Sequence, residues 1–360
     1  MAWSLSKKEE IMRSVIECEK QLTNSNRIAI IAHQTPDADA LCSAVALKKL
    51  IRQNFDEKDD KIIDIFVDAE EIPSLLQPIV RNVEINQQNA ETYDLAICVD
   101  CSNLTRAGKY QEIFNNAKDT LNIDHHETNE QFANNNLVFK SSSTCEGLYL
   151  LFNIRQKTIS DDVCKLVYSG IITDTNNLTQ GNVTIRTHKV IADFMSRHID
   201  LEALKEHFFK NNTKSKAFLL QKALGTLNFF LGDRVAFMKL TKQDFIDTES
   251  TFEDSVGIVN HGVEIKGVDI AIIAIKKEDN SYYVSLRSKN GIDVGVIAQA
   301  MGGGGHETMA AFSYEGSIVD MREALLAICR EELKKHPIND CDHDDLFADS
   351  SEKQKDTAQN

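Results

Sequence analysis

The chain has 360 residues, of which 42% are hydrophobic and 26% are charged, a composition typical of a globular protein with room for two domains. Lys and Arg number 40 against 55 Asp and Glu, so the formal net charge is −15. This charge argues against binding to long nucleic acid, because that affinity rests on cationic side chains that neutralise phosphates. No run approaches the roughly 18 apolar residues of a membrane span, and the N-terminus lacks the apolar core of a signal peptide. With eight scattered cysteines, we expect a cytoplasmic protein with reduced thiols and no membrane partner.

The first half of the chain alternates predicted helices and strands. Four short apolar runs read as buried strands, at 27–32, 62–67, 93–99 and 120–123. Helical spacing is expected at 5–23, from residue 40 onwards, and at 70–78, 109–117, 144–156 and 161–173. Strands that alternate with helices predict an α/β fold whose doubly wound parallel sheet carries helices on both faces.

The second half predicts a helical connector and a smaller domain. Residues 186–230 have helical patterns, and strands at 234–240, 268–277 and 282–288 follow, with helices at 254–261, 293–300 and 317–335. We therefore expect a catalytic domain at 1–190, a connector at 191–230, an α/β domain at 231–336 and a disordered acidic tail at 337–360. The active site is expected in a cleft between the two domains.

Charged and imidazole side chains follow three of the predicted strands directly. His33, Asp37 and Asp39 come after the first strand, Asp100 after the third, and Asp124-His125-His126 after the fourth. Ligands of open α/β sheets bind at the carboxyl ends of the strands. We therefore expect these residues, although far apart in sequence, to meet at one edge of the sheet.

The types of these residues favour a site for divalent cations. Asp37 and Asp39 alternate after Pro36, so one loop aims two carboxylates at neighbouring points, and Mn²⁺ accepts both carboxylate and imidazole ligands. The alternative is that Asp37 caps a helix while Asp39 is solvated, and that Asp100 is a cap or turn residue. Asp174 follows the apolar helix at 161–173, where the helix dipole disfavours an anion unless a cation lies nearby.

Together these motifs resemble the DHH phosphoesterase superfamily. The matching residues are His33-x-x-x-Asp37-x-Asp39, Asp100, Asp124-His125-His126 and Asp174. The ligands that the resemblance implies for one Mn²⁺ ion are His33, Asp37 and Asp100, and those for the other are Asp39, Asp100, His125 and Asp174. It also implies that Asp124 orients an imidazole and that His126 faces the scissile phosphate, with Mg²⁺ or Co²⁺ as substitutes for Mn²⁺.

A second signature lies in the C-terminal domain. Arg287-Ser288 precede a glycine run, Gly302, Gly303, Gly304 and Gly305, which His306 follows. Glycines let backbone N–H groups approach a phosphate, and Arg and His supply charge and hydrogen bonds, although four glycines alone indicate only a flexible loop. The arrangement resembles the DHH-associated C-terminal domain, and the size and layout resemble the nanoRNase/pAp phosphatase group.

Three positions depart from the family pattern. Cys42 stands where a small Gly is usual, Asn176-Asn177-Leu178 replace a glycine-containing segment after Asp174, and Met309-Ala310-Ala311-Phe312 replace Ala-Ala-Gly-Phe. The last two lie where substrate is expected, so they bear on substrate identity.

The resemblance implies a Mn²⁺-dependent phosphoesterase that hydrolyses short 5′-phosphorylated oligoribonucleotides, pAp, or both by two-metal-ion hydrolysis, with a homodimer expected from the family. One alternative is a phosphodiesterase for cyclic dinucleotides or their linear products. An alternative of another class is a catalytically silent nucleotide sensor.

Overall fold

The computed structural model describes residues 5–69, 72–179, 181–278, 280–305 and 307–337. It divides into two compact units, Met1–Asn211 and Asn212–Asn360, and each is described by itself. Within the described ranges, no helix is both long and apolar enough to span a bilayer. The predicted tail lies outside the described residues, apart from Pro337.

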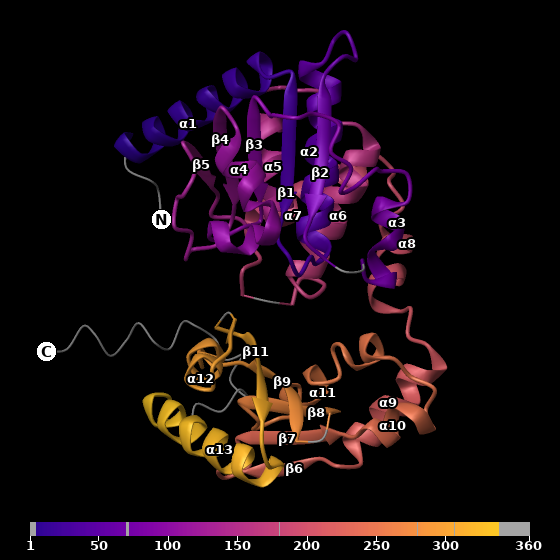
Figure 1. The fold of residues 1–360 in the computed structure, drawn as a ribbon. Coiled ribbons are helices and arrows are strands. Elements are labelled where there is room, and N and C mark those ends of the chain that lie inside the picture. The colour runs from indigo at the N-terminus through magenta and orange to yellow at the C-terminus, as the bar shows by residue number, and fades with distance from the viewer. Residues whose placement is uncertain (1–4, 70–71, 180, 279, 306, 338–360) are drawn as a thin grey trace, which may run out of the picture. The chain divides into compact units, whose positions relative to one another are not determined.

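The first unit contains a five-stranded parallel sheet in the order β2-β1-β3-β4-β5 (Figure 1). Its strands are β1 Arg27–Ala32, β2 Ile62–Val67, β3 Leu95–Val99, β4 Asp119–Asp124 and β5 Asn135–Val138. β1 lies between β2 and β3, with Ile28 beside Ile62 of β2 and Leu95 of β3. The parallel doubly wound sheet is thus confirmed. β5 was not predicted, because its sequence, Asn-Asn-Leu-Val, has no apolar run and no alternating pattern.

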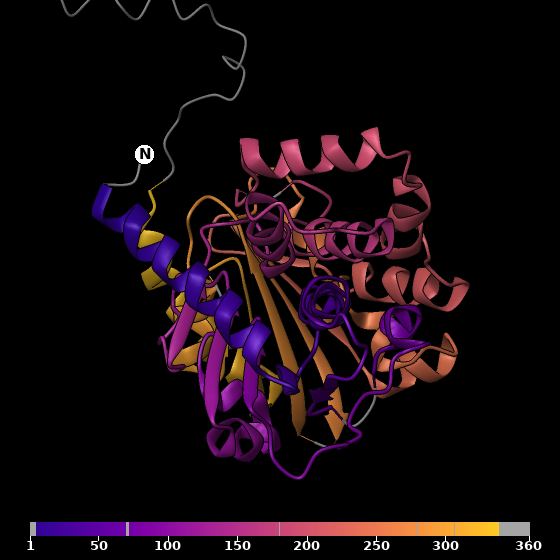
Figure 2. The ribbon, with the colours of Figure 1, turned by 90° about the horizontal axis from the view of Figure 1, so that it is seen from above.

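Ten helical segments of the described chain surround this sheet. They are α1 Leu5–Asn24, α2 Ala38–Phe55, η1 Ser74–Leu76, α3 Gln77–Val80, η2 Leu104–Tyr110, α4 Gln111–Asn116, α5 Thr144–Ile154, α6 Asp161–Asp174, α7 Ile185–Ser196 and α8 Leu201–Phe209. α1 lies beside edge strand β5, which both Figure 1 and Figure 2 show. The helix expected at 109–117 begins only at Gln111, because Gly108 has a φ of +58° that no α-helix accommodates.

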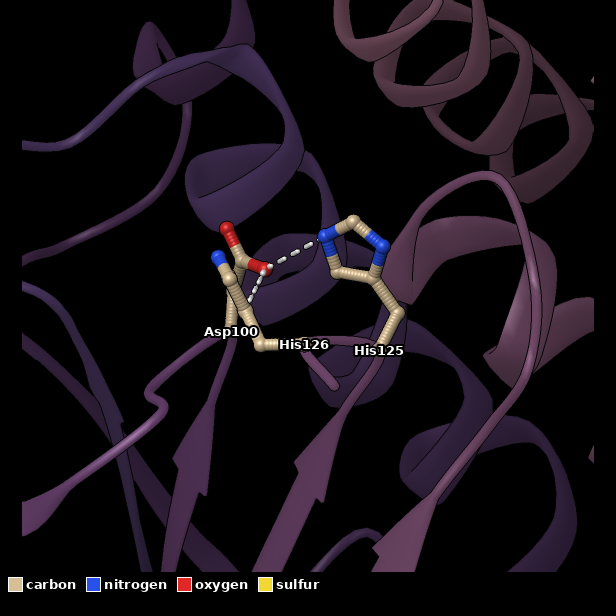
Figure 3. A group of neighbouring side chains, drawn as sticks. All are labelled: Asp100, His125 and His126. Atoms are coloured by element: carbon tan, nitrogen blue, oxygen red, sulfur yellow. Dashed lines mark ion pairs between the residues drawn. The ribbon is translucent and has the colours of Figure 1, made fainter. Parts of the chain in front are cut away.

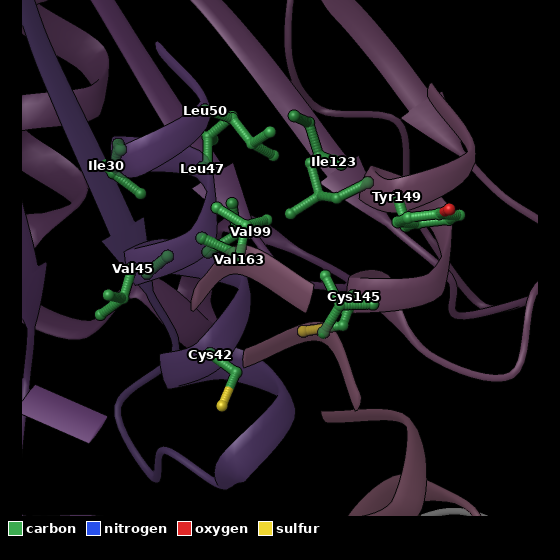
Figure 4. Close-up of a cluster of buried hydrophobic side chains, with 14 of the residues drawn as sticks. Ile30, Cys42, Val45, Leu47, Leu50, Val99, Ile123, Cys145, Tyr149 and Val163 are labelled. Atoms are coloured by element: carbon green, nitrogen blue, oxygen red, sulfur yellow. The ribbon is translucent and has the colours of Figure 1, made fainter. Parts of the chain in front are cut away.

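Alternate residues of the strands are buried on opposite faces of the sheet. Ile30 and Val99 point toward α2, α5 and α6, where Leu47 packs beside them in the main core (Figure 4). Ile31 and Cys98 enter a second cluster under η2 and α4. Both faces are therefore covered, which explains why the strands read as nearly continuous apolar runs.

The second unit contains a six-stranded mixed sheet in the order β10-β11-β9-β8-β7-β6. Its strands are β6 Asn228–Phe230, β7 Val235–Leu240, β8 Ile270–Glu278, β9 Ser281–Ser288, β10 Gly304–Gly305 and β11 Met309–Glu315. Its helical segments are α9 Lys214–Leu224, α10 Lys242–Asp247, η3 Phe252–Ser255, α11 Asn260–Val263, α12 Val294–Ala300 and α13 Ile318–Lys335. α12 and α13 bury one face of the sheet, while α9 and α11 cover β7 and β8 on the other, and η3 packs against α9.

Two helix predictions in this part of the chain were wrong. The helical pattern expected to continue to residue 230 ends with α9, and Asn228–Phe230 pair with β7 as strand β6. The helix expected at 254–261 is two short pieces, η3 and α11, separated by Gly257 with a φ of +86°. The expected connector is also divided between the units, because α7 and α8 lie in the first and α9 in the second.

Candidate metal centre

The loop after β1 brings three of the selected residues to the sheet edge. His33 is buried directly after the strand, and Asp37 caps α2 by accepting the N–H of Ala40 at 2.9 Å. The cap therefore exists, yet the other carboxylate oxygen, Oδ2, lies 3.9 Å from His33 Nε2, so Asp37 also faces the cluster. The solvated alternative for Asp39 is wrong, since this residue sits in the first turn of α2 and is only 1% exposed.

Asp100 lies at the centre of the cluster, immediately after β3. Its Oδ2 lies 3.6 Å from His33 Nε2, and its Oδ1 lies 3.6 Å from His125 Nε2 and 3.8 Å from His126 Nδ1. Figure 3 shows its carboxylate between the two imidazoles. Asp100 is 2% exposed and has a φ of +57°, a conformation in which non-glycine residues are strained and which is concentrated at functional sites. The two oxygens thus point to different neighbours.

The potential ligand atoms form overlapping groups in which all atoms lie within 4.8 Å of one another. The groups are His33, Asp37 and Asp100; Asp39, His125 and Asp174; and Asp100, His125 and His126. The first two contain all six residues predicted as ligands. Imidazoles combined with carboxylates suit Mn²⁺ and related divalent cations, so these residues could hold metal.

The buried carboxylates of this cluster repel one another, and burial disfavours their charged forms. Burial raises the pKa of Asp39 to about 7, and the carboxylate of Asp100 adds to this effect. Burial and the nearby Asp39 raise the pKa of Asp174, the last residue of α6, well above its usual range. Burial also acts to raise the pKa of Asp100, but the adjacent imidazoles of His33 and His125 bring it below the usual range. A divalent cation would offset this repulsion.

Asp124 is completely buried and holds His126. Its Oδ1 lies 2.7 Å from His126 Nδ1. Burial acts to lower the pKa of His126, but the bond to Asp124 and the charges of Asp100 and Asp124 together outweigh it, and the pKa is raised. Two residues absent from the sequence-based selection complete this arrangement: Asn129 donates to Asp124 Oδ2 at 2.6 Å and to Asn122 Oδ1 at 2.7 Å. Their signal was positional, because Asn122 lies two residues before Asp124 and Asn129 lies three residues after His126.

In the second unit, Arg287 lies on β9 and is half-buried. Its guanidinium donates to Leu286 O at 2.8 Å, and among the described residues it forms no ion pair with a carboxylate. Burial lowers the pKa of Arg287, and an anion would favour its charged form. Ser288 is different, because its buried hydroxyl hydrogen-bonds to Ile292 O at 2.6 Å and Glu307 O at 3.0 Å and so links two loops.

The glycine run is exposed and partly ordered as strand β10, which pairs with β11, so it is not simply a flexible loop. A Cβ at Gly303 would collide with Ala311 O and Phe312 Cβ, so close packing on β11 requires glycine there. His306 lies outside the described residues.

The departures from the family pattern differ in their surroundings. Cys42 is fully buried in the core on α2. Asn176, Asn177 and Leu178 have φ values of +46°, +57° and +66°, forming a left-handed turn after Asp174. Asn adopts this region more readily than most residues, so it can replace the usual glycine. Met309 pairs with Arg287 across the sheet.

Two protein-family models match successive parts of the chain, one in each unit. Residues 27–171 match the DHH family, N-terminal domain, and residues 234–335 match the DHHA1 domain. The chain is 27% identical to the bifunctional oligoribonuclease and PAP phosphatase NrnA of Mycoplasma genitalium, over 89% of this chain and 98% of that protein. It is 26% identical to the protein of the same name from Thermus thermophilus, over 91% and 95%.

The chain is also similar to a protein named for a different activity and to a solved structure with the same fold. The cyclic-di-AMP phosphodiesterase GdpP of Bacillus subtilis is 23% identical over 89% of this chain but only 48% of its own length. The crystal structure of an exopolyphosphatase-related protein from Bacteroides fragilis superposes with a TM-score of 0.79, covering 90% of this chain and 96% of that one at 22% identity. The chain is therefore an enzyme of the DHH phosphoesterase superfamily, with an N-terminal DHH domain followed by a DHHA1 domain.

Proposed function

We propose that this protein is a Mn²⁺-dependent phosphoesterase that hydrolyses short 5′-phosphorylated oligoribonucleotides and pAp. The observation that carries the proposal is the carboxylate of Asp100, whose Oδ2 faces His33 while its Oδ1 faces His125. A carboxylate placed in this way can serve both ligand groups. The names of the two similar proteins from Mycoplasma genitalium and Thermus thermophilus support the choice of substrates.

In this proposal the first unit performs the chemistry. His33, Asp37 and Asp100 would hold one ion, and Asp39, Asp100, His125 and Asp174 the other. When bound, two such ions supply Lewis-acid chemistry that activates water and offsets charge on the phosphoryl group. Asp124 fixes the orientation of the His126 ring through Nδ1, so that the ring can stabilise the phosphoryl oxygens.

The second unit would supply the substrate anchor. Arg287 lacks a carboxylate partner among the described residues and presents a planar set of donors that matches phosphate geometry. The exposed backbone of Gly302–Gly305 would contact the same distal phosphate or nucleotide, and we also assign His306 to this anchor. The preference for short substrates is in keeping with the acidic net charge of the chain, which disfavours long nucleic acid.

A second candidate is hydrolysis of a cyclic dinucleotide or its linear product. It is favoured by the similarity to the Bacillus subtilis phosphodiesterase, and the Asn176–Leu178 turn and Met309 are the departures that bear on it. A silent nucleotide sensor is disfavoured, because such a protein has no need of a complete set of ligands.

Product analysis with Mn²⁺ tests these candidates. The purified protein would be incubated with pAp, a 5′-phosphorylated diribonucleotide, a longer RNA, and a cyclic dinucleotide together with its linear form. We expect AMP from pAp, mononucleotides from the diribonucleotide, and slow attack on long RNA. Cleavage of only the cyclic or linear dinucleotide would replace the proposal with the second candidate. Turnover of none of them, with metal bound, would refute both. Asp100→Asn serves as the inactive control, since activity from a contaminating nuclease would persist in it.

A further inference from the structure

The N-terminus of α5 contacts two of the proposed ligands at once. The backbone N–H of Thr144 donates to Asp39 Oδ2 at 2.7 Å, and its hydroxyl donates to Asp100 Oδ1 at 2.9 Å. The next N–H, of Cys145, donates to Asp39 Oδ1 at 3.0 Å. Thr144 is completely buried, where such charge-assisted hydrogen bonds are strong. We propose that Thr144 is a positioning residue that fixes Asp39 and Asp100 relative to each other and so shapes the metal site that they share.

The geometry assigns this role to one side of the cluster. The hydroxyl of Thr144 contacts Asp100 Oδ1, which is also the oxygen that lies 3.6 Å from His125. The backbone contact is to Asp39, which belongs with His125 and Asp174. Thr144 therefore acts on the Asp39 side of the centre, and loss of its hydroxyl should affect the ion on this side more than the ion at His33.

The turn before Thr144 is itself anchored. Ser143 caps α5 by accepting the N–H of Glu146 at 3.0 Å. The carboxylate of Glu146 is fully buried and accepts the N–H of Ser142 at 3.1 Å and the hydroxyl of Thr187, on α7, at 2.9 Å. The start of α5, where Thr144 lies, is thus fixed by bonds within α5 and to α7. A residue that positions metal ligands needs such a rigid support.

α6 packs closely against Asp39 and the start of α5. A Cβ added at Gly170 would lie 2.5 Å from Asp39 Oδ1 and 2.5 Å from Cys145 Sγ, and real Cβ atoms are not found so close to other heavy atoms. Gly170 therefore allows α6 to pack directly against Asp39 and the start of α5. This contact gives a physical reason for a glycine within a helix, where it otherwise lowers stability.

Thr144→Val tests the proposal, because it keeps the side-chain volume and the N–H bond to Asp39 and removes only the hydroxyl. Mn²⁺ binding would be followed by electron paramagnetic resonance of the free ion, which needs no substrate. We expect the wild type to bind two ions and the variant to bind one of them about 10–100-fold more weakly, the usual effect of losing a group that orients a metal ligand. Turnover of the variant should recover at high Mn²⁺, and Thr144→Ser should restore both properties.

Thr248→Val is the matched control, since Thr248 is also buried but donates to Asp244 O in the second unit. If Thr144→Val fails to fold, Thr144→Ala compared with Thr144→Ser provides the same contrast. Wild-type affinity for both ions in the Val and Ala variants would overturn the inference, and so would equal weakening in the Ser variant. The inference rests on the proposed function only through the metal ions, so the titration decides it even if no tested substrate is cleaved.

Discussion

The two units differ in how they place charge. At the sheet edge of the first unit, His33, Asp39 and Asp100 are almost completely buried and Asp100 adopts a strained backbone conformation. In the second unit, Arg287 on β9 is half-buried, and the glycine run on the other side of β11 is exposed. Buried like charges are unfavourable unless a counter-charge is present, whereas a single guanidinium near the surface costs much less. The contrast supports our proposal that the first unit holds cations and the second an anionic ligand.

The strongest test of this contrast is Asp100→Asn. Asn tolerates the positive φ of this position, so the substitution removes charge without forcing the backbone to change. We expect kcat to fall about a thousandfold, because loss of a single electrostatic contact at an active site costs about 10²–10³-fold and Asp100 is the one residue assigned to both proposed ligand sets. Metal analysis should show fewer than two Mn²⁺ ions per chain.

Asp59→Asn controls for this substitution. Asp59 has a similar φ of +54° in the same unit, and its side chain is 89% exposed. Its substitution should leave kcat and metal content unchanged. Near wild-type turnover in Asp100→Asn would show that Asp100 does not link the two ligand groups.

Asp124→Asn should have the next largest effect. Asp124 contacts His126 and Asn129 and belongs to none of the three potential ligand groups. We therefore expect kcat to fall about 10–100-fold while two Mn²⁺ ions still bind. Single-turnover kinetics and metal analysis of the same preparation check this. Loss of an ion instead would place Asp124 among the ligands.

Arg287→Ala should separate recognition from chemistry. If the guanidinium holds a distal phosphate, KM for pAp should rise about tenfold, the equivalent of ~1.4 kcal/mol, with little change in kcat. Arg322→Ala is the matched control, because Arg322 lies on α13 beside Phe230 and has no role in the proposal. An equal loss in kcat, or an altered metal content, would contradict the division of labour between the units.

The effect of metal on stability should be confined to the first unit. Each Mn²⁺ ion at about 100 times its dissociation constant should stabilise that unit by about 2.7 kcal/mol, or roughly 5–10 °C in its Tm. Calorimetry with EDTA and with Mn²⁺ measures the shift. In Asp174→Asn, removal of one repelling carboxylate should make the metal-free protein more stable and reduce the gain from Mn²⁺. A shift in the second unit's transition alone would contradict the assignment.

Much of the fold could be predicted because local patterns agree with the tertiary structure. The strands β1 to β4 are apolar runs buried on both faces, and their ends were predicted to within about two residues. β5 was missed because its pairing with β4 supports a sequence without a strand pattern, and β6 was mistaken for helix because its apolar residues continue the spacing of α9. In both cases the neighbouring strand decides the structure.

The six proposed ligands could be selected from sequence because carboxylates and imidazoles follow the strands and helix that carry them, and the parallel sheet directs those strand ends to one edge. The sequence could not show that the two oxygens of Asp100 face different groups, that Asn129 supports Asp124, or that Thr144 joins Asp39 to Asp100. Residue types and strand ends are local properties, so sequence alone determined them. The distances between these side chains depend on how loops and helices fold and pack at the sheet edge, and only the tertiary structure decided those.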